Sequence, residues 1–321
     1  MRVSVVVPLY NKARYIVRCL DSIRAQTYSD LEIIVVNDGS TDGSGQILRD
    51  YQDPRLKKID QTNAGPGAAR NRGVAEARGE IVAMLDADDQ WREDYVARSL
   101  DRMLKSPSVA CVTSAMTELP LGIATSSRWP RLGIAPGLFT VTPETPPRVL
   151  AGIVSNMLPS CTVIRKPIFE KWGGFYAKTR CLYAEDAHLY MKVLLNHPVY
   201  FEQDPGIFRH MDASELATNL THVRPVEPFL LDPDDLRRAC PPELSGVLRT
   251  FLAMRAAKTA SVYGYYGLQG RARELMRNFV SPEDWRLPFF FVALLGCTPA
   301  APLAGRLARL AGFNLRETGR A

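Results

Sequence analysis

The stretch Ile81-Val82-Ala83-Met84-Leu85-Asp86-Ala87-Asp88-Asp89 joins a short apolar run directly to three carboxylates. Its apolar part predicts a buried β-strand, because the run is short and polar residues follow it at once. The same arrangement occurs earlier, where the apolar residues 31–36 are followed by Asn37-Asp38-Gly39-Ser40. Neighbouring parallel strands end at the same edge of a sheet, which is where open α/β sheets bind ligands. The two stretches therefore predict a carboxylate-lined ligand site at that edge.

The first 115 residues alternate strand-like and helix-like patterns. Short apolar runs predict strands at residues 3–7, 31–36, 56–59, 81–85 and 109–113. Apolar residues at helical spacing predict helices between them, most clearly at 16–23, 68–77 and 93–104. This alternation is typical of βαβ units, so the expected fold is α/β, with a single Rossmann-like, mostly parallel sheet flanked by helices.

The pattern changes after residue 115. Six prolines between residues 117 and 150 predict an irregular, mobile surface loop. Further strands are expected at residues 160–164 and 201–208, with a helix at 185–195 between them on which Asp186 begins an inward-facing stripe. From residue 216 onward the chain is expected to be mainly helical.

Composition places the chain among ordinary globular proteins. With 321 residues, of which 46% are apolar, it can form one large domain or two modest ones. Its six cysteines include no C-x-x-C pair, so neither a zinc site nor a disulfide framework is expected. The chain begins directly with the strand at 3–7 and without the pattern of a signal peptide, so we expect a cytoplasmic protein.

The carboxylates of Asp86, Asp88 and Asp89 are candidates for binding a divalent metal. Like charges this close raise one another's pKa, and a bound cation offsets that cost. Mg²⁺ or Mn²⁺ is usually held by one or two carboxylates together with the oxygens of a diphosphate. The alternative is that an acid, Asp89 above all, only caps the helix that follows.

Two loops are candidates for enclosing a nucleotide. Pro8-Leu9-Tyr10-Asn11 follows the first predicted strand and Asn37-Asp38-Gly39-Ser40 follows its neighbour, which places Asp38 to accept an N–H of a base. A third segment, Asn63-Ala64-Gly65-Pro66-Gly67-Ala68-Ala69-Arg70-Asn71-Arg72-Gly73, combines a glycine-rich turn with arginines at a helix start, which suits phosphate or sugar hydroxyls. Each segment alone is also compatible with an ordinary turn or helix start.

In this order and spacing, these motifs resemble those of the family 2 glycosyltransferases of the GT-A fold. The resemblance includes Gly173-Gly174-Phe175 and Glu185-Asp186 and covers about residues 1–215. It implies a nucleotide-binding half at 1–115, an acceptor and base half at 116–215, and a helical C-terminal region at 216–321.

The resemblance also implies roles for individual residues. Asp38 would contact the uracil of a UDP-sugar, Asp88 would bind Mn²⁺ or Mg²⁺, and Asp186 would be the catalytic base. The helix dipole favours the ionised form of a carboxylate at a helix start, although the same position suits a simple N-cap. The other implied donor-binding residues are Pro8, Tyr10, Asn11, Asn63, Gly65, Arg70, Asp86 and Ala87, and the second implied metal ligand is His210.

The implied activity is inverting transfer of a sugar from a nucleotide donor to a hydroxyl of a glycan or lipid-linked acceptor, in the synthesis of cell-surface polysaccharide or glycolipid. The sequence lacks the Gln/Arg-x-x-Arg-Trp segment and the membrane spans of the family's processive synthases, so we expect one sugar per encounter. A sugar nucleotidyltransferase is a weaker alternative, because its glycine-rich loop after the first strand is missing. A non-catalytic nucleotide-sugar-binding protein stays open as the other alternative.

Residues 241–321 contain eleven Lys or Arg and five Asp or Glu, which accounts for the whole net charge of +6. With the apolar run Phe289-Phe290-Phe291-Val292, this favours two interpretations equally. One is a peripheral contact with anionic lipid at the inner face of the membrane, and the other is a helical cover on the catalytic domain or a contact in a homo-oligomer. The basic residues belong to no recognisable nucleic-acid-binding module, so nucleic acid is not an expected partner.

Overall fold

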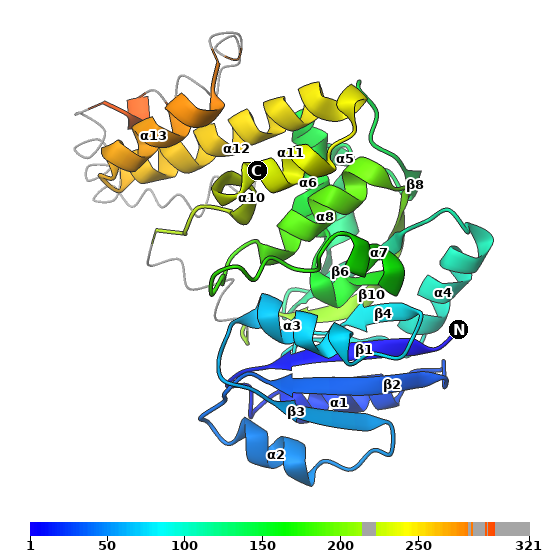
Figure 1. Ribbon diagram of the computed structural model, residues 1–321. Helices are drawn as coiled ribbons and strands as arrows, with labels where there is room; N and C mark the ends of the chain where they lie inside the picture. Colours follow the sequence, from blue (N-terminus) through cyan, green and yellow to red (C-terminus); the bar gives the residue numbers. More distant parts are fainter. Residues whose placement is uncertain (214–222, 282–283, 285–292, 294, 299–321) are drawn as a thin grey trace.

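The computed structural model describes residues 1–213, 223–281, 284, 293 and 295–298, and it contains one mixed sheet flanked by helices (Figure 1). The strand order is β3-β2-β1-β4-β9-β6-β10-β5, with β7 paired to β6 and β8 to β10. The strands are β1 Val3–Leu9, β2 Leu31–Asn37, β3 Leu56–Asp60, β4 Ile81–Met84, β5 Gln90–Trp91, β6 Cys111–Leu119, β7 Ile123–Ala124, β8 Gly137–Phe139, β9 Thr162–Arg165 and β10 Val199–His210. The α-helices are α1 Ile16–Arg24, α2 Ser44–Asp50, α3 Pro66–Ala75, α4 Tyr95–Lys105, α5 Trp129–Leu132, α6 Pro147–Asn156, α7 Lys166–Lys171, α8 Glu185–Asn196, α10 Pro228–Leu231, α11 Pro233–Ala239, α12 Ser245–Tyr265 and α13 Gln269–Phe279.

The parallel sheet expected from the alternating pattern is present in the first half of the chain. β1 pairs in parallel with β2 on one side and β4 on the other, and β2 pairs in parallel with β3. Beyond β4 the order becomes mixed, because β9 lies antiparallel between β4 and β6. The carboxyl ends of β1, β2 and β4 therefore share one edge, as the two acidic stretches predicted.

Each face of the sheet is covered by its own set of helices. Val3, Val5 and Val7 alternate along β1 and pack with apolar residues of α1 and α4. Val6 points to the opposite face, where it joins a core that includes Val74 of α3 and the buried side of α8. Alternation of side chains along a strand explains why one run of valines serves both cores.

The C-terminal helices form a layer that extends the second core. Figure 1 shows α12 and α13 packed along each other on the side of α6, α8 and α11 that faces away from β1–β3. α12 buries Phe251 together with a series of alanines, and both belong to the same core as α8. The mainly helical C-terminal region is thus confirmed for the described residues, whereas the apolar run at 289–292 and most of the basic tail lie outside them.

The prediction of an irregular loop at 117–150 was wrong. β6 continues to Leu119, and the segment also contains β7, α5, β8 and the start of α6, with Trp129 almost fully buried. Two of the six prolines, Pro130 and Pro147, stand in the first turns of α5 and α6, where a missing N–H costs nothing. Elements of two to four residues show no periodicity, so the sequence pattern did not reveal them.

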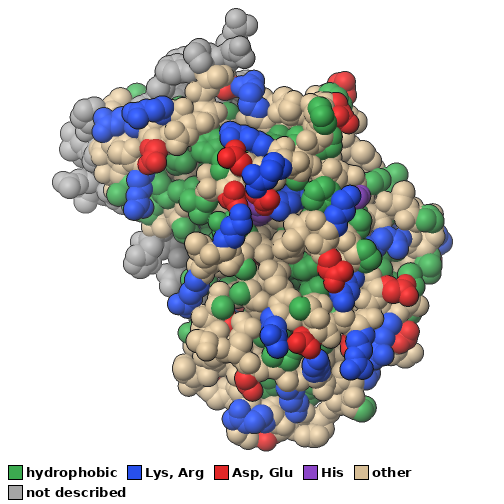
Figure 2. All heavy atoms as spheres, in the orientation of Figure 1, with side chains coloured by type: hydrophobic (Ala, Val, Ile, Leu, Met, Phe, Trp, Pro, Cys, Tyr) green, Lys and Arg blue, Asp and Glu red, His purple; other side chains and the backbone are tan. Residues whose placement is uncertain are grey.

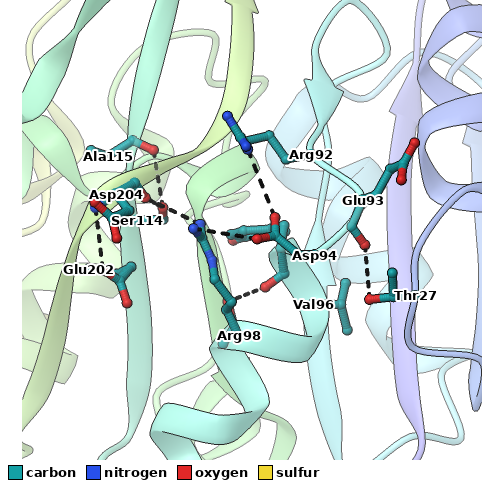
Figure 3. Close-up of polar contacts among 12 residues, drawn as sticks. Thr27, Arg92, Glu93, Asp94, Val96, Arg98, Ser114, Ala115, Glu202 and Asp204 are labelled. Carbon is teal, nitrogen blue, oxygen red and sulfur yellow. Dashed lines mark hydrogen bonds and ion pairs between the residues drawn. The ribbon is translucent and has the colours of Figure 1, made fainter.

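An irregularity in β10 aligns the end of that strand with the candidate site. The register against β6 shifts between Glu202 and Ile207. As Figure 3 shows, the carbonyl of Asp204 accepts hydrogen bonds from Ser114 Oγ at 2.9 Å and from Arg98 Nη2 at 3.3 Å. These contacts fix the bulge, and β10 then continues to His210 beside the acidic turn that follows β4.

Close packing of α3 on β1 gives the first prediction. A Cβ atom at Gly73 would lie 2.3 Å from Cγ1 of Val6, which is fully buried. Overpacking of this kind costs about 1–3 kcal/mol, whereas alanine gains roughly 1 kcal/mol over glycine in a helix. We therefore expect Gly73→Ala to lower the free energy of unfolding. Chemical denaturation would measure the difference. Gly246→Ala on α12 is the matched control, because nothing lies within 4 Å of its added Cβ, and a similar loss in both variants would contradict the packing argument.

Candidate active site

A cleft of about 810 Å³ opens at the carboxyl edge of β1, β2 and β4. One wall is made by the loops that leave these strands and by the start of α3. The opposite wall is made by the start of α8, by α6 and by residues of α10 and α12. Ten of the twelve residues to which the resemblance assigned a role line it, together with Asp89: Pro8, Tyr10, Asp38, Asn63, Gly65, Arg70, Asp86, Ala87, Asp88 and Asp186.

Asp38 lines the cleft at the end of β2 and organises the loop at residues 61–65. Its carboxylate accepts hydrogen bonds from the backbone N–H of Ala64 at 2.8 Å and of Gly65 at 2.9 Å, and from Gln61 Nε2 at 2.8 Å. The side chain is only 3% exposed. In the same loop, the buried Oδ1 of Asn63 has no hydrogen-bond partner among the described residues, so it is a free acceptor beside the cleft.

Asn11 has a structural position outside the cleft lining. Its Oδ1 accepts a hydrogen bond from the backbone N–H of Thr41 at 2.8 Å, and its own N–H donates to Ser40 Oγ at 3.1 Å. Asn11 adopts a left-handed conformation with φ of 50°, which asparagine tolerates better than most residues. It therefore joins the loops that follow β1 and β2, and this fixes the position of its neighbour Tyr10.

The acidic turn after β4 places three carboxylates in one partly buried corner. Burial, followed by the charge of Asp86, raises the pKa of Asp88. Burial and the charges of Asp86 and Asp88 also raise the pKa of Asp89, which is 6% exposed. Two cations offset this crowding, since Lys12 Nζ lies 2.9 Å from Asp88 Oδ2 and Arg70 Nη2 lies 2.6 Å from Asp86 Oδ1.

Arg70 connects the two walls of the cleft. Besides Asp86, its guanidinium donates through Nη1 to Glu185 Oε1 at 2.8 Å, at the start of α8. Burial alone would lower the pKa of Arg70, but Asp86 and Glu185 raise it, so the side chain stays charged. We call this pair of contacts the Arg70 bridge. It sets the distance between the sheet edge and the helix that carries Asp186.

Asp186 lies in the first turn of α8 and faces the cleft. Burial and the neighbouring charge of Glu185 raise its pKa to about 7, although Arg70 acts in the opposite direction. Its Oδ1 accepts a hydrogen bond from the backbone N–H of Ala187 at 2.8 Å. Ala184 precedes the helix in the left-handed region with φ of 57°, a conformation that costs energy for a residue with a Cβ.

His210 does not line the cleft. Its Nε2 lies 2.9 Å from Oε1 of Gln90, and its backbone N–H donates to Asp89 Oδ1 at 3.3 Å. The backbone of His210 thus contacts the acidic turn, while its imidazole contacts β5. Within the described ranges, no three His, Cys, Asp or Glu side chains are grouped as a ready-made metal site.

The reverse side of α8 is also held by charge. His188 Nε2 lies 2.8 Å from Asp235 Oδ2, and Lys192 Nζ lies 2.5 Å from the same oxygen. Burial opposes ionisation of Asp235, but hydrogen bonds from His188 and Lys192 lower its pKa to about 2. Figure 2 shows acidic and basic side chains intermingled on this face over α10 and α11. α8 is therefore fixed between the Arg70 bridge and the α11 contacts.

Several residues of the cleft escaped the sequence reasoning. Lys12 follows Asn11 directly, and a cation beside a strand exit was the only signal for it. Arg180, Arg209, Arg224 and Arg255 come from separate later segments, so only the folded chain brings them to the cleft. All six cysteines are free, as the sequence indicated.

A carboxylate-lined cleft at the carboxyl edge of such a sheet lies where open α/β proteins bind their ligands. The family described as glycosyl transferase family 2 matches residues 4–173, and the chain therefore belongs to this family.

Curated relatives match about a third of the chain. Glycosyltransferase GlyA from Streptococcus pneumoniae is 48% identical over 97 residues, which are 30% of this chain and 14% of GlyA. Chondroitin synthase from Escherichia coli is 43% identical over 112 residues, which are 34% of this chain and 16% of that protein. The chain thus spans only a small part of the length of these relatives.

Solved structures share the fold over nearly the whole chain. TarS from S. aureus in complex with UDP-GlcNAc has a TM-score of 0.59 at 21% identity and covers 96% of this chain and 83% of that chain. Mannosyltransferase PcManGT from Pyrobaculum calidifontis, in complex with GDP-Man and Mn²⁺, has a TM-score of 0.56 at 21% identity, with coverage of 96% and 87%. The fold is accordingly the GT-A fold of glycosyltransferases. No helix in the described part of the chain has the length and apolar character needed to cross a membrane.

The Arg70 bridge gives the second prediction. Arg70→Met removes the cation and leaves Asp86 and Glu185 facing each other, so we expect the free energy of unfolding at neutral pH to fall by about 3 kcal/mol. Arg70 also opposes the rise in the pKa of the adjacent Asp186, so its removal raises that pKa further. The deficit relative to the wild type should therefore shrink as the pH falls and Asp186 takes up a proton.

The matched control is Arg72→Met, on the same helix but exposed and paired at 3.2 Å with Glu76. An exposed pair contributes less than about 1 kcal/mol. Urea denaturation of both variants between pH 5 and 8 would measure the difference. Equal losses in the two variants, or a deficit independent of pH, would show that Arg70 has no special electrostatic role.

Proposed function

We propose that this protein is an inverting, metal-dependent glycosyltransferase that transfers a sugar from a UDP-sugar to a hydroxyl of a glycan or lipid-linked acceptor, in the synthesis of cell-surface polysaccharide or glycolipid. The observation that carries the proposal is the shared cleft of Asp186 and Asp88, one carboxylate on each wall. The complexes of TarS with UDP-GlcNAc and of PcManGT with GDP-Man support a nucleotide-sugar donor.

Asp186 has the properties of a general base. A base works best when its pKa lies near the operating pH, and burial raises the pKa of Asp186 to about 7. Its position on a helix that is buried along most of its length keeps the carboxylate in one place. In the proposed reaction Asp186 takes the proton of the acceptor hydroxyl, whose oxygen attacks the anomeric carbon as the nucleoside diphosphate leaves.

The acidic turn has the donor set that a hard divalent cation requires. The crowded carboxylates of Asp86 and Asp88 offer oxygen ligands, and Mg²⁺ or Mn²⁺ needs only one or two such residues when a diphosphate supplies the others. We propose that Asp88 holds the ion, whose chemistry when bound is to neutralise charge on the leaving diphosphate. Asp86, through Arg70, keeps the turn aligned with α8.

Asp38 and the loop that it organises are proposed to hold the nucleoside. The oxygens of Asp38 already accept two backbone N–H groups, so the residue shapes the pocket as well as facing it. The free acceptor on Asn63 and the exposed ring of Tyr10, which is 43% exposed, complete this end of the cleft. A nucleobase stacked on the ring of Tyr10 would be stabilised by the aromatic contact.

Substitution of the base tests the proposed reaction. We expect Asp186→Asn to bind the donor as the wild type does but to lose transfer by about 10²–10⁴-fold. In the wild type kcat/KM should rise with pH through about 7, because the base must be ionised, and this rising limb should vanish from the residual activity of the variant.

Nucleoside diphosphate release from a panel of UDP- and GDP-sugars with Mn²⁺ or Mg²⁺ is the measurement, with Asp88→Ala as the blank. Normal turnover by Asp186→Asn would remove this residue from the mechanism, and binding without any turnover in the wild type would favour a nucleotide-sugar-binding protein.

Lys12 gives a separate test of the metal site. Its ammonium group already neutralises Asp88, so it competes with a cation for that carboxylate. We expect Lys12→Gln to bind Mn²⁺ about tenfold more tightly without nucleotide, which corresponds to about 1.4 kcal/mol. Loss of the free-Mn²⁺ signal in electron paramagnetic resonance would measure the affinity. Lys57→Gln, which removes one of the two cations beside Glu76 far from the cleft, is the control. An unchanged or weaker affinity of Lys12→Gln would place the metal elsewhere.

A further inference from the structure

The acidic turn after β4 is held by its backbone as well as by its carboxylates. The N–H of Asp86 donates to Ser160 Oγ at 3.1 Å, and the carbonyl of Asp86 accepts the N–H of Asp89 at 2.9 Å. The carbonyl of Asp88 accepts a hydrogen bond from Nη2 of Arg18 at 2.8 Å. Arg18 is the charged member of this set, and it reaches the turn from α1, the helix that follows β1.

Arg18 belongs to a polar stripe along α1. Four residues further on, Ser22 Oγ accepts the N–H of Trp91 at 3.2 Å. Gln26, two residues past the end of the helix, donates through Nε2 to the carbonyl of Arg92 at 2.8 Å. Residues four apart on a helix share a face, so these side chains follow one line. They guide the chain from the acidic turn through β5, and Arg18 is the contact that reaches the proposed metal ligand.

Two cations contact Asp88, but at different atoms. Lys12 Nζ lies 2.9 Å from the carboxylate oxygen Oδ2, whereas Arg18 bonds to the backbone carbonyl. Both cations pack on the ring of Tyr15, with Lys12 Nζ at 5.8 Å and Arg18 Cζ at 5.4 Å from its centroid. Lys12 must leave the carboxylate when a metal ion binds there. The contact of Arg18 leaves both carboxylate oxygens free.

Arg18 is committed to this contact and to no ion pair. The acid nearest to it on α1, Asp21, pairs with Arg24 at 2.8 Å instead. In the part of the chain that the structure describes, no carboxylate forms an ion pair with Arg18. Its Nε is buried and also lacks a hydrogen-bond partner among those residues. The guanidinium is therefore fixed by the ring of Tyr15 and by the carbonyl of Asp88, and a charged donor makes that hydrogen bond a strong one.

We propose that Arg18 is a positioning residue of the metal site. It holds the backbone of Asp88 so that the carboxylate faces the cleft, and it keeps this contact when Lys12 gives way to the metal ion. Arg18 does not line the cleft, so it acts through Asp88 and touches neither the ion nor the donor. The inference rests on the proposed function, because the metal ion is the one that the proposed transfer requires.

The sign of the effect separates positioning from simple charge. Loss of a nearby cation alone makes a carboxylate site more attractive to Mn²⁺, as expected for Lys12→Gln. Loss of a positioning contact acts in the opposite direction, since contacts that hold a ligand residue typically change metal affinity about 10–100-fold when they are removed. The Lys12→Gln background isolates this effect, because Lys12 no longer pairs with Asp88 there.

We expect Lys12→Gln/Arg18→Gln to bind Mn²⁺ without nucleotide about tenfold or more weakly than Lys12→Gln, measured by the free-Mn²⁺ signal in electron paramagnetic resonance. Lys12→Gln/Tyr15→Leu changes no charge and removes only the ring that supports Arg18, so it should weaken binding about threefold. Lys12→Gln/Arg24→Gln is the matched control. Arg24 lies on the same helix and pairs with Asp21, so its loss should change the affinity by less than about twofold.

Turnover gives a second readout. In the single variant Arg18→Gln, the Mn²⁺ concentration for half-maximal release of nucleoside diphosphate should rise about tenfold or more, while the rate at saturating Mn²⁺ should fall less than about threefold. A lower rate at saturating Mn²⁺ with an unchanged Mn²⁺ requirement would assign Arg18 a general structural role and overturn the inference.

The outcomes separate this inference from the proposed function. Unchanged or tighter Mn²⁺ binding by Lys12→Gln/Arg18→Gln would overturn the positioning role. If that variant does not fold, unchanged binding by Lys12→Gln/Tyr15→Leu would overturn it instead. Absence of Mn²⁺ binding by Lys12→Gln itself would remove Asp88 from the metal site, which would end the metal-dependent part of the proposed function and this inference with it.

Discussion

The active cleft depends on one buried guanidinium. Arg70 bonds Asp86 at the sheet edge and Glu185 at the start of α8, so a single side chain spans the two walls. Its neighbour Asn71 adds two hydrogen bonds to the backbone of Phe175, one donated by Nδ2 at 2.8 Å and one accepted by Oδ1 at 2.9 Å. Gly174 allows this approach, since a Cβ there would lie 2.5 Å from Asn71 Oδ1. Two adjacent residues of α3 therefore place the turn and the helix that present Asp186.

This arrangement explains why motifs far apart in the sequence occur together. The arginine and asparagine of one segment are the direct partners of Glu185 and of the Gly173-Gly174-Phe175 turn. In a low-dielectric site, a polar group without a partner costs free energy of folding, whereas a fully paired network favours one arrangement of the surrounding elements. The crowded carboxylates are the opposite case, because burial and neighbouring negative charges raise the pKa values of Asp88 and Asp89. Local destabilisation of this kind is expected at functional sites, and the proposed metal ion would relieve it.

Local sequence predicted the elements that have a clear period or a sharp polar end. The strands from β1 to β4 and the loops after them follow from apolar runs ending in turn residues. Asp38, Asp88 and Asp186 were brought to one cleft as expected. The interpretation of 117–150 failed because elements such as α5 are too short to show a period. Their places in motifs predicted that Asn11 binds the donor and His210 the metal. The side-chain hydrogen bonds that the structure shows, to Thr41 and Gln90, depend on tertiary neighbours and could not be predicted. The wall that holds Arg224 and Arg255 forms only when α10 and α12 fold back, which no local pattern encodes.

The family match covers one wall of the cleft and only part of the other. The family match ends at residue 173, before α8, α10 and α12, and the curated relatives align over about 100 residues of the chain. The part that carries the acidic turn therefore lies within the family match. The C-terminal helices lie outside that match and pack in one core with α6 and α8, while the Arg70 bridge holds α8 to the sheet edge. A lineage can in this way acquire a new acceptor by exchanging one wall, without rebuilding the chemistry of the other.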